Sequence, residues 1–311
     1  MDVSIIIANS NSQKLLAECL NSIYEWTRDV TFEVIVVDNA STDGSVAMVK
    51  RYFPQVRLIE NSANNRYAIA NNQGLDIAQG RHAFFLNNDT VLLGNTVKEM
   101  MEFLDTHPQA GGVGGHLIYP DGAYQEACFR FPSALNMFYL LCLSRFYWKT
   151  SLAANYPRIQ DETEPALVDF VTGACLMARR DLLQQMHGMD EDYYFYGEDS
   201  DLCYRIRQAG RPIYYLPQST KIIHYGGMSS VNLFDDDQQR KHLRGWKSRF
   251  LFIKKHYPLR RRVVIFMAVL SALGVNGILY ALAAVKRRDL RYFQAAMGAH
   301  LAITQAARRL L

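Results

Sequence analysis

The sequence predicts an α/β fold, in which helices flank a sheet, followed by a hydrophobic helical appendage at the C-terminus. In roughly the first hundred residues, short apolar runs alternate with segments whose apolar residues recur at the helical period. Polar residues follow three of these runs, as expected where strands end at the edge of a sheet. Near the C-terminus, a separate stretch of 23 residues, Val263–Val285, carries no formal charge.

The expected strands and helices alternate strictly along the chain. Strands are predicted at Val3–Ala8, Glu33–Val37, Val56–Ile59 and His82–Leu86. Helices are predicted at Gln13–Tyr24, Ser45–Tyr52 and Tyr67–Ala78. This βαβαβαβ order implies parallel strands with helices on both faces of the sheet. Ligands bind such sheets beyond the carboxyl ends of the strands, so the polar residues there are candidates for chemistry.

The middle of the chain is less regular. It opens with a Gly-rich stretch at 111–115 and has a predicted turn at 120–122. The segment Leu135–Leu152 is crowded with aromatic residues and leucines, which indicates core, with a membrane-dipping patch as the alternative. The later expected elements are an apolar run at Leu167–Ala178, a short helix after Asp181, a helix at 198–209 and a strand at 212–216.

Length and composition are those of a globular protein in a reducing compartment. A chain of 311 residues, 49% of them hydrophobic, can bury a full core in one large domain plus an appendage. The five cysteines are scattered, without a C-x-x-C pair, which argues against a disulfide framework and a zinc site. The N-terminal apolar run is short and lacks a basic leader, so it is typical of a core strand rather than a signal peptide.

The net charge of +4 conceals an asymmetry between the two parts of the chain. From Lys254 to Leu311 there are eleven Lys or Arg and one acidic residue, a balance of +10. The preceding part has 23 basic and 29 acidic residues, a balance of −6. Basic tails on acidic domains favour anionic surfaces such as lipid headgroups or nucleic acid.

The charge-free stretch Val263–Val285 is long enough to span a bilayer as a helix. Basic clusters flank both of its ends, at 260–262 and 286–288, whereas a single span normally has its basic flank on the cytoplasmic side only. Two glycines and Asn276 interrupt it near the middle. A span, a helical hairpin, an in-plane anchor and a soluble-core helix are all open interpretations. The segment favours a protein at the cytoplasmic face of the cell membrane.

Two predicted strands end in acidic residues. Asp38 follows an apolar run where a carboxylate can accept N–H groups of a pyrimidine ring, although a turn or helix cap is the alternative. Asp89 ends the run Asn87-Asn88-Asp89, and Mg²⁺ and Mn²⁺ prefer such hard oxygen ligands. Asp89 is therefore a candidate for holding a metal against a diphosphate, with capping again the alternative.

Two further signals lie in the second half of the chain. Glu198, Asp199 and Asp201 begin a predicted helix, whose dipole keeps a carboxylate ionised, as a general base requires. Ordinary helix capping explains such acids equally well. His224 follows an apolar strand, and a lone histidine there is usually structural unless the fold brings it near Asp89.

Taken in order, these signals resemble glycosyltransferase family 2 enzymes of the GT-A fold, particularly the bacterial rhamnosyltransferase-like branch that builds surface polysaccharides. The resemblance runs from Val3 to about Ser230. The motifs that carry it are VVDNASTDGS at 36–45, Asn72-x-Gly74, LNNDT at 86–90, Gly173-Ala174, Gly188-Met189-Asp190-Glu191, YGEDSDLCYR at 196–205 and His224. It implies a Rossmann-like mixed sheet flanked by helices over residues 1–253 and a basic, hydrophobic helical membrane-associating tail over residues 254–311.

The resemblance also implies a role for each site residue. The residues implied for the nucleotide pocket are Asp38, Ala8, Asn9 and, near it, Asp43, with Asn88 facing the donor. In a D-x-D-like metal site, Asp89 would be the principal acid and His224 a further metal or diphosphate ligand. Asp199 would be the catalytic base, with Glu198 and Asp201 as supporting acids. The implied cofactor is a divalent metal, Mg²⁺ or Mn²⁺.

Two positions depart from the family pattern. The first D-x-D position is Asn87, which leaves the site one negative charge short. Where many relatives have Asn-x-Gly-Phe, this chain has Asn64-Asn65-Arg66-Tyr67. Arg66 therefore replaces a flexible glycine in the donor-side loop and supplies a cation able to bind a diphosphate.

The predicted activity is inverting transfer of a sugar, with rhamnose as a candidate, from a UDP- or dTDP-sugar to a lipid-linked saccharide in surface polysaccharide synthesis. The predicted partners are donor, acceptor and membrane lipids, and no nucleic acid. One alternative, a nucleotidyltransferase that makes sugar nucleotides, would favour a Gly-rich phosphate loop after the first strand, but Asn9–Gln13 contains no glycine. The other, a non-catalytic membrane scaffold, predicts loss of the acids that metal and base require, and these acids are present.

Overall fold

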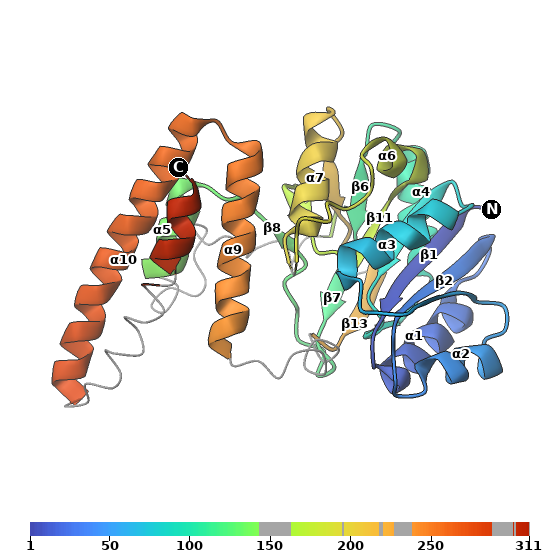
Figure 1. The fold of residues 1–311 in the computed structure, drawn as a ribbon. Coiled ribbons are helices and arrows are strands. Elements are labelled where there is room, and N and C mark those ends of the chain that lie inside the picture. The colour runs from blue at the N-terminus through green and yellow to red at the C-terminus, as the bar shows by residue number, and fades with distance from the viewer. Residues whose placement is uncertain are drawn as a thin grey trace. The chain divides into compact units, whose positions relative to one another are not determined.

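The computed structural model describes residues 1–142, 163–194, 196–217, 220–226, 238–287, 301 and 303–310 (Figure 1). The chain divides into two compact units. The first unit consists of Met1–Phe129, Arg158–Tyr194 and Glu198–Asp235, and the second of Arg130–Pro157, Phe195–Gly197 and Asp236–Leu311. The predicted boundary after residue 253 lies within a single helix, α9 (Gln238–His256).

An eight-stranded mixed sheet forms the centre of the first unit, in the order β3-β2-β1-β4-β11-β6-β12-β9. Its strands are β1 Val3–Asn9, β2 Phe32–Asn39, β3 Arg57–Asn61, β4 His82–Leu86, β6 Gly112–Gly114, β9 Ala166–Val168, β11 Cys175–Arg179 and β12 Ile213–Tyr215. The first four strands are parallel, which confirms the order predicted from the sequence. β11 pairs antiparallel with both β4 and β6, and this makes the sheet mixed.

Helices flank this sheet, as predicted. Those of the first unit are α1 Gln13–Trp26, α2 Ser45–Tyr52, α3 Arg66–Ile77, α4 Thr96–Thr106, α6 Arg180–Gln185 and α7 Glu198–Gln208. Close packing of α3 on β1 depends on Gly74, because a Cβ there would lie 2.4 Å from Cγ2 of Ile6. Ile6 and its neighbours in β1 are fully buried, so any larger residue at position 74 would displace the core.

Two smaller sheets complete the first unit. One joins β8 (Cys128–Phe129) to β10 (Phe170–Val171). The other has the order β5-β13-β7, with β5 Thr90–Leu92, β13 Lys221–His224 and β7 His116–Ile118. β13 pairs antiparallel with β5, and His224 is the partner of Thr90. This pairing carries the end of β13 to the carboxyl end of β4.

The second unit contains α5 (Ala134–Cys142), α9, α10 (Leu259–Arg287) and the short helix η3 (Arg308–Leu310). α10 contacts α5 and η3. It runs without interruption through Gly274 and Asn276, whose Nδ2 donates a hydrogen bond to the carbonyl of Leu141 over 2.9 Å. A hairpin within Val263–Val285 is therefore wrong, because the whole segment lies in one continuous helix.

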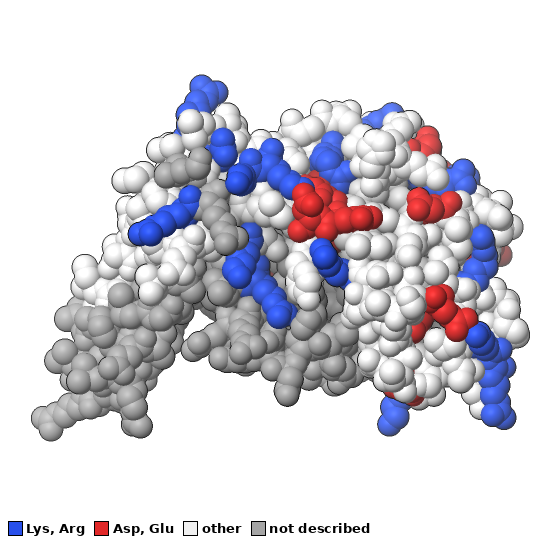
Figure 2. All heavy atoms as spheres, viewed as in Figure 1, with Lys and Arg blue, Asp and Glu red and all other residues white. Residues whose placement is uncertain are grey.

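α10 is apolar on two faces. Ile265, Val269 and Ala272 are buried, whereas Val264, Met267 and Ile278 are 55% to 64% exposed. The segment Leu259–Leu279 has a mean hydropathy of 2.0 and is long enough to cross a membrane. No Asp or Glu occurs between residues 238 and 287, so the charged side chains of α9 and α10 are basic; Lys and Arg are blue in Figure 2.

The aromatic segment predicted as core at Leu135–Leu152 is only partly described. In α5, Met137, Tyr139 and Leu141 are buried while Leu135 is exposed. Residues 143–152 of that prediction lie outside the described residues. The four cysteines whose side chains are described are all free and buried, as expected for a reducing compartment.

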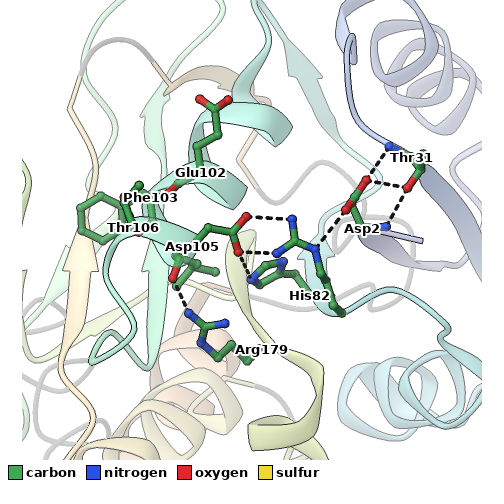
Figure 3. A network of polar contacts seen from close by, with 10 residues as sticks. Asp2, Thr31, His82, Glu102, Phe103, Asp105, Thr106 and Arg179 are labelled. Atoms are coloured by element: carbon green, nitrogen blue, oxygen red, sulfur yellow. Dashed lines mark hydrogen bonds and ion pairs between the residues drawn. The ribbon is translucent and has the colours of Figure 1, made fainter.

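Near the amino ends of β1 and β4, Arg81 joins Asp2 to Asp105 in a polar network, of which Figure 3 labels Asp2, His82 and Asp105. Its Nε donates to Asp2, before β1, over 3.0 Å, and its Nη2 donates to Asp105, at the end of α4, over 2.7 Å. Beside it, His82 is fully buried, and its Nε2 lies 3.5 Å from Asp105. Burial lowers the pKa of His82 to about 4, against a weaker opposing effect of Asp105.

This buried histidine predicts acid-sensitive stability. Because its folded pKa lies below the ordinary value of about 6.5, the unfolded chain binds a proton more readily, and stability is lost as pH falls from about 6.5 towards 4. Between pH 7 and 5 the expected loss is about 2 kcal/mol from this residue. Urea unfolding should show a smaller loss for His82→Gln. An equal pH dependence in both proteins would assign the effect to other groups.

Candidate active site

The carboxyl ends of β1, β2 and β4 share a continuous chain of hydrogen bonds. Asn9 and Asp38 are register partners, and Asn9 Nδ2 donates to Asp38 Oδ1 over 2.8 Å. Asn88 Nδ2 in turn donates to Asn9 Oδ1 over 2.8 Å. All three side chains are buried. The structure therefore brings together the residues predicted for the donor pocket, with Ala8 one position earlier on β1.

The turn after β2 fixes the carboxylate of Asp38. The backbone N–H of Ser41 donates to Asp38 Oδ2 over 2.8 Å, and its hydroxyl donates to Oδ1 over 2.6 Å. Ser41 Oγ also accepts the N–H of Asn11 over 2.8 Å, which locks the turn after β1 to the turn after β2. Ser41 is thus a positioning residue that the sequence motif contained but did not single out.

Asp43 caps two helices. Its Oδ2 accepts the N–H of Gln13, the first residue of α1, over 2.7 Å, and its Oδ1 accepts the N–H of Ser45, the first residue of α2, over 3.0 Å. Burial alone would raise the pKa of Asp43, but these bonds and that from the Ser45 hydroxyl lower it. The described contacts of Asp43 are therefore those of the capping alternative, and its place near the nucleotide stays a prediction.

Asp89 is buried beside His224. The side chain of Asp89 is fully buried, and neither carboxylate oxygen accepts a hydrogen bond from the residues that the structure describes. His224 Nε2 lies 3.3 Å from Asp89 Oδ1, since the pairing of β13 with β5 places the two strand ends together. His224 therefore lies near Asp89, as the functional interpretation of this histidine required.

These two side chains fit a divalent cation. An ionised carboxylate buried without donors is costly, and a cation removes that cost. The 3.3 Å between Asp89 Oδ1 and His224 Nε2 is close to the roughly 3 Å that separates adjacent ligands of an octahedral ion. Among the described residues no group of three or more His, Cys, Asp or Glu side chains is placed to hold a metal, and oxygens of amides, carbonyls, phosphate or water can complete the shell of such a cation.

Asp199 and Glu198 begin α7, in different environments. Asp199 Oδ2 accepts the N–H of Gly173 over 3.1 Å, and its Oδ1 accepts that of Ser200 over 2.7 Å. Glu198 is 8% exposed, and its Oε2 has no hydrogen-bond partner in the described part of the chain. Burial, and then the negative charge of Asp199, raise the pKa of Glu198. Glu198 therefore favours its neutral form more than an exposed glutamate does.

Asp201 forms a buried ion pair. Its Oδ2 lies 2.6 Å from Arg205 Nε, and its Oδ1 accepts the hydroxyl of Tyr193 over 3.3 Å. Arg205 also donates to the carbonyls of Met186 and, over 2.8 Å, Gly188. Asp201 therefore supports the site by anchoring the loop at 186–188 to α7.

The neighbouring motif residues fasten the same loop to α3. Asn72 Nδ2 donates to the carbonyl of Met189 over 2.8 Å, and Asn72 Oδ1 accepts the N–H of Met189 over 2.8 Å. Gly188 has φ +64°, and a Cβ there would lie 2.3 Å from Asn72 Oδ1. Any side chain at position 188 would collide with Asn72, so the two hydrogen bonds between Asn72 and Met189 require glycine there.

Tyr67 is connected to Asp199 through Gly173. Its hydroxyl donates to the carbonyl of Gly173 over 2.8 Å, and Gly173 binds Asp199 through its N–H. Burial, followed by the negative charges of Glu198, Asp199 and Asp89, raises the pKa of Tyr67 well above its ordinary value. Three acids therefore contribute negative charge at this buried hydroxyl. Sequence reasoning placed Tyr67 in an altered loop and at the start of a predicted helix but did not single it out.

Arg66 is engaged by the loop before α7. It has φ +69°, and its guanidinium carbon lies 5.1 Å from the ring centroid of Tyr194. Its Nη1 donates to the carbonyl of Glu191 over 3.4 Å. The described contacts join α3 to residues 191–194, and a role of Arg66 in diphosphate binding stays a prediction.

Comparisons with known proteins agree with this arrangement. The family model described as Glycosyl transferase family 2 matches residues 4–186. An N-acetylglucosaminyl-diphospho-decaprenol L-rhamnosyltransferase of Mycobacterium tuberculosis is 26% identical over 281 residues, or 86% of this chain and 89% of that protein. The O-antigen biosynthesis protein RfbC of Myxococcus xanthus is 26% identical over 240 residues, covering 73% of this chain and 17% of RfbC.

Two solved structures share the fold. The mannosyltransferase PcManGT from Pyrobaculum calidifontis, in complex with GDP-Man and Mn²⁺, superposes with a TM-score of 0.59 at 19% identity, covering 99% of this chain and 86% of that one. Residues 1–349 of TarS from Staphylococcus aureus, in complex with UDP, give a TM-score of 0.53 at 16% identity, covering 99% and 92%. These likenesses confirm the predicted GT-A-type fold.

Proposed function

The chain belongs to glycosyl transferase family 2 and is a glycosyltransferase, and from this premise we propose that it transfers a sugar with inversion from a UDP- or dTDP-sugar to a lipid-linked saccharide. The observation that carries the proposal is the buried Asp89, which accepts no hydrogen bond from the described residues and lies 3.3 Å from His224 Nε2. Together with Asp199 at the start of α7, an acid suited to proton abstraction, this acid suited to a metal supports a single displacement.

In the proposed reaction, Asp199 accepts the proton of an acceptor hydroxyl. The acceptor oxygen forms a bond to the anomeric carbon from the face opposite the nucleotide, while the bond to the diphosphate breaks and its electron pair leaves with the diphosphate. One displacement without an enzyme-bound intermediate inverts the configuration. Glu198, whose raised pKa favours the neutral form, leaves Asp199 as the charged base of the pair.

On the donor side, Asp38 would accept the ring N–H of a pyrimidine, held in place by Asn9 and Ser41. Asn88, tied to Asn9, would face the donor. Asp89 and His224 would hold Mg²⁺ or Mn²⁺. The cation, when bound, would neutralise charge on the departing diphosphate.

The rhamnosyltransferase relative supports the proposed substrates. Its name specifies rhamnose as the sugar and a diphospho-decaprenol as the carrier of the acceptor. It matches 86% of this chain, including part of the second unit. We therefore extend to this protein rhamnose as the candidate sugar and a polyprenyl-diphosphate-linked saccharide as the acceptor class, in surface polysaccharide synthesis.

A thermal-shift screen tests the donor proposal. UDP-, dTDP- and GDP-sugars are compared with and without Mn²⁺, since a ligand that binds the native state raises its Tm. We expect a Mn²⁺-dependent rise with a uridine or thymidine nucleotide and none with GDP-sugars. Stabilisation by GDP-sugars alone would contradict the role of Asp38.

We further propose that the reaction takes place at the cytoplasmic face of a membrane, which the acceptor class and the apolar helix α10 support. The outer stripe of α10 exposes Val264, Met267 and Ile278, three and eleven residues apart, on one side of the helix. The basic residues around it would add roughly 1 kcal/mol each at an anionic leaflet. With one face packed on α5 and the other apolar and exposed, α10 fits an in-plane anchor better than a soluble-core helix.

Substitutions on the outer stripe should release the protein from lipid. In the full chain, Val264→Glu with Met267→Glu and Ile278→Glu is expected to weaken binding to phosphatidylglycerol-containing vesicles at least about 10-fold, because charges cannot enter the acyl region. Vesicle co-sedimentation measures the change. Tyr52→Glu with Leu93→Glu, on exposed positions of the first unit, is the matched control. Equal binding by both variants would contradict the anchor.

A further inference from the structure

Gln125 binds the histidine of the proposed metal site. Its side chain is 8% exposed, and its Oε1 lies 2.7 Å from Nδ1 of His224. No motif marks this glutamine, and it is separated from His224 by 99 residues of sequence. Asp89 thus lies beside Nε2 of the His224 ring, and Gln125 lies beside Nδ1 of the same ring.

A turn and a strand pairing deliver Gln125 to this place. The chain reverses after β7 where Tyr119 N–H donates to the carbonyl of Ala123 over 2.8 Å. The Gln125 N–H then donates back to the carbonyl of Leu117 over 2.9 Å. Because β7 pairs in parallel with β13, this return brings Gln125 beside the end of β13, where His224 lies.

Gly226 leaves the space that the amide occupies. It has φ +72°, and a Cβ at this position would lie 2.9 Å from Gln125 Nε2. A side chain there would be strained and would push the amide away from the imidazole. Two features of the local backbone, a turn and a glycine, therefore hold one buried amide against His224.

The contact selects one tautomer of the imidazole. A carbonyl oxygen such as Gln125 Oε1 only accepts hydrogen bonds, so Nδ1 of His224 must donate. In the neutral ring, Nε2 then keeps its lone pair. Asn87 Nδ2, at 3.2 Å from Nε2, donates to that lone pair, and Asp89 Oδ1 faces the same atom at 3.3 Å.

We propose that Gln125 is a positioning residue that holds His224 as the Nδ1–H tautomer, so that Nε2 is presented to the divalent cation shared with Asp89. The inference rests on the proposed function, in which Asp89 and His224 bind the metal. It also gives Asn87 a role that an aspartate would not have, because its amide donates to Nε2 in the absence of the cation. Partners that orient a metal-binding histidine typically change metal affinity 10- to 100-fold.

The first test needs neither metal nor substrate. Long-range ¹⁵N–¹H correlation of the histidine rings in the metal-free full chain identifies which nitrogen carries the proton, with His224→Phe used to assign the signals. We expect the Nδ1–H tautomer for His224 in the wild type. Gln125→Met, which keeps length but removes the acceptor, should populate the Nε2–H tautomer. A wild-type ring protonated at Nε2 would overturn the inference.

The second test measures Mn²⁺ binding by electron paramagnetic resonance, with Mn²⁺ alone and with UDP. Gln125→Met should bind Mn²⁺ about 10- to 100-fold more weakly. Gln125→Glu, which restores an acceptor for Nδ1, should recover most of the affinity, whereas Gln79→Met, at an exposed loop position, should match the wild type.

The two failures are distinguishable. If Gln125→Met binds Mn²⁺ as tightly as the wild type, the positioning role is wrong while the metal site stands. If the wild type binds no Mn²⁺ even with UDP, the metal in the proposed function is wrong, and the inference falls with it.

Discussion

Asp199→Asn is expected to lower kcat by about 10²–10⁴-fold, because the amide keeps the shape of the carboxylate but cannot take the acceptor proton. Donor binding should change little, since the oxygen of an asparagine side chain at this position can still accept a hydrogen bond from the N–H of Gly173 or of Ser200. Steady-state kinetics and a separate UDP-binding titration measure the two effects.

Two neighbouring variants serve as controls for this assignment. Asp201→Asn should chiefly lower stability, because it leaves Arg205 without its buried partner, and breaking such a pair costs roughly 3–5 kcal/mol. The folded fraction should retain turnover. Glu198→Gln should keep most activity, since it mimics the neutral form that burial favours. Normal turnover in Asp199→Asn with an inactive Glu198→Gln would reassign the base to Glu198.

Asp89→Asn is expected to remove Mn²⁺ binding and with it most of the donor affinity, because the diphosphate shares the cation with this carboxylate in the proposed site. Activity should fall about 10²-fold or more. His224→Ala should show the same loss in milder form, and excess chelator should reproduce it in the wild type. Isothermal titration of Mn²⁺ and of UDP with Mn²⁺ measures both affinities.

The same substitution should stabilise the metal-free protein. Asp89 is fully buried and accepts no hydrogen bond from the described residues, so removing its charge relieves a desolvation cost. A gain on the order of 1 kcal/mol in the free energy of unfolding is expected. Full activity of the wild type in excess chelator, or an Asp89→Asn protein that is both active and less stable, would contradict the metal site.

The sequence by itself determined the parallel half of the sheet and the residues at its carboxyl edge. Buried strands of β1, β2 and β4 appear as apolar runs, and their alternation with helical patterns permits few topologies. Because parallel strands end at the same edge, Asn9, Asp38 and Asn88 were predicted to lie together, and they form one hydrogen-bonded chain.

The sequence motifs did not distinguish the roles of acidic residues that belong to the same motif. Asp38 and Asp43 belong to one motif, yet Asp38 is held by Asn9 and Ser41 while Asp43 caps two helices. Asp201 lies two residues after Asp199 in the same helix but forms an ion pair with Arg205. Each role depends on which backbone N–H or cation the fold places within hydrogen-bond distance, and a motif does not contain that information.

Only the tertiary structure decided the contacts between distant segments. His224 meets Asp89 through the pairing of β13 with β5, and Gln125 meets His224 through the pairing of β13 with β7. The side chain of Asn276 in α10 is hydrogen-bonded by the carbonyl of Leu141, which comes from another helix. The periodicity of apolar residues indicates which side chains are buried. The contacts above depend instead on the register between strands and helices that are far apart in the chain. Packing sets that register only when the whole fold forms.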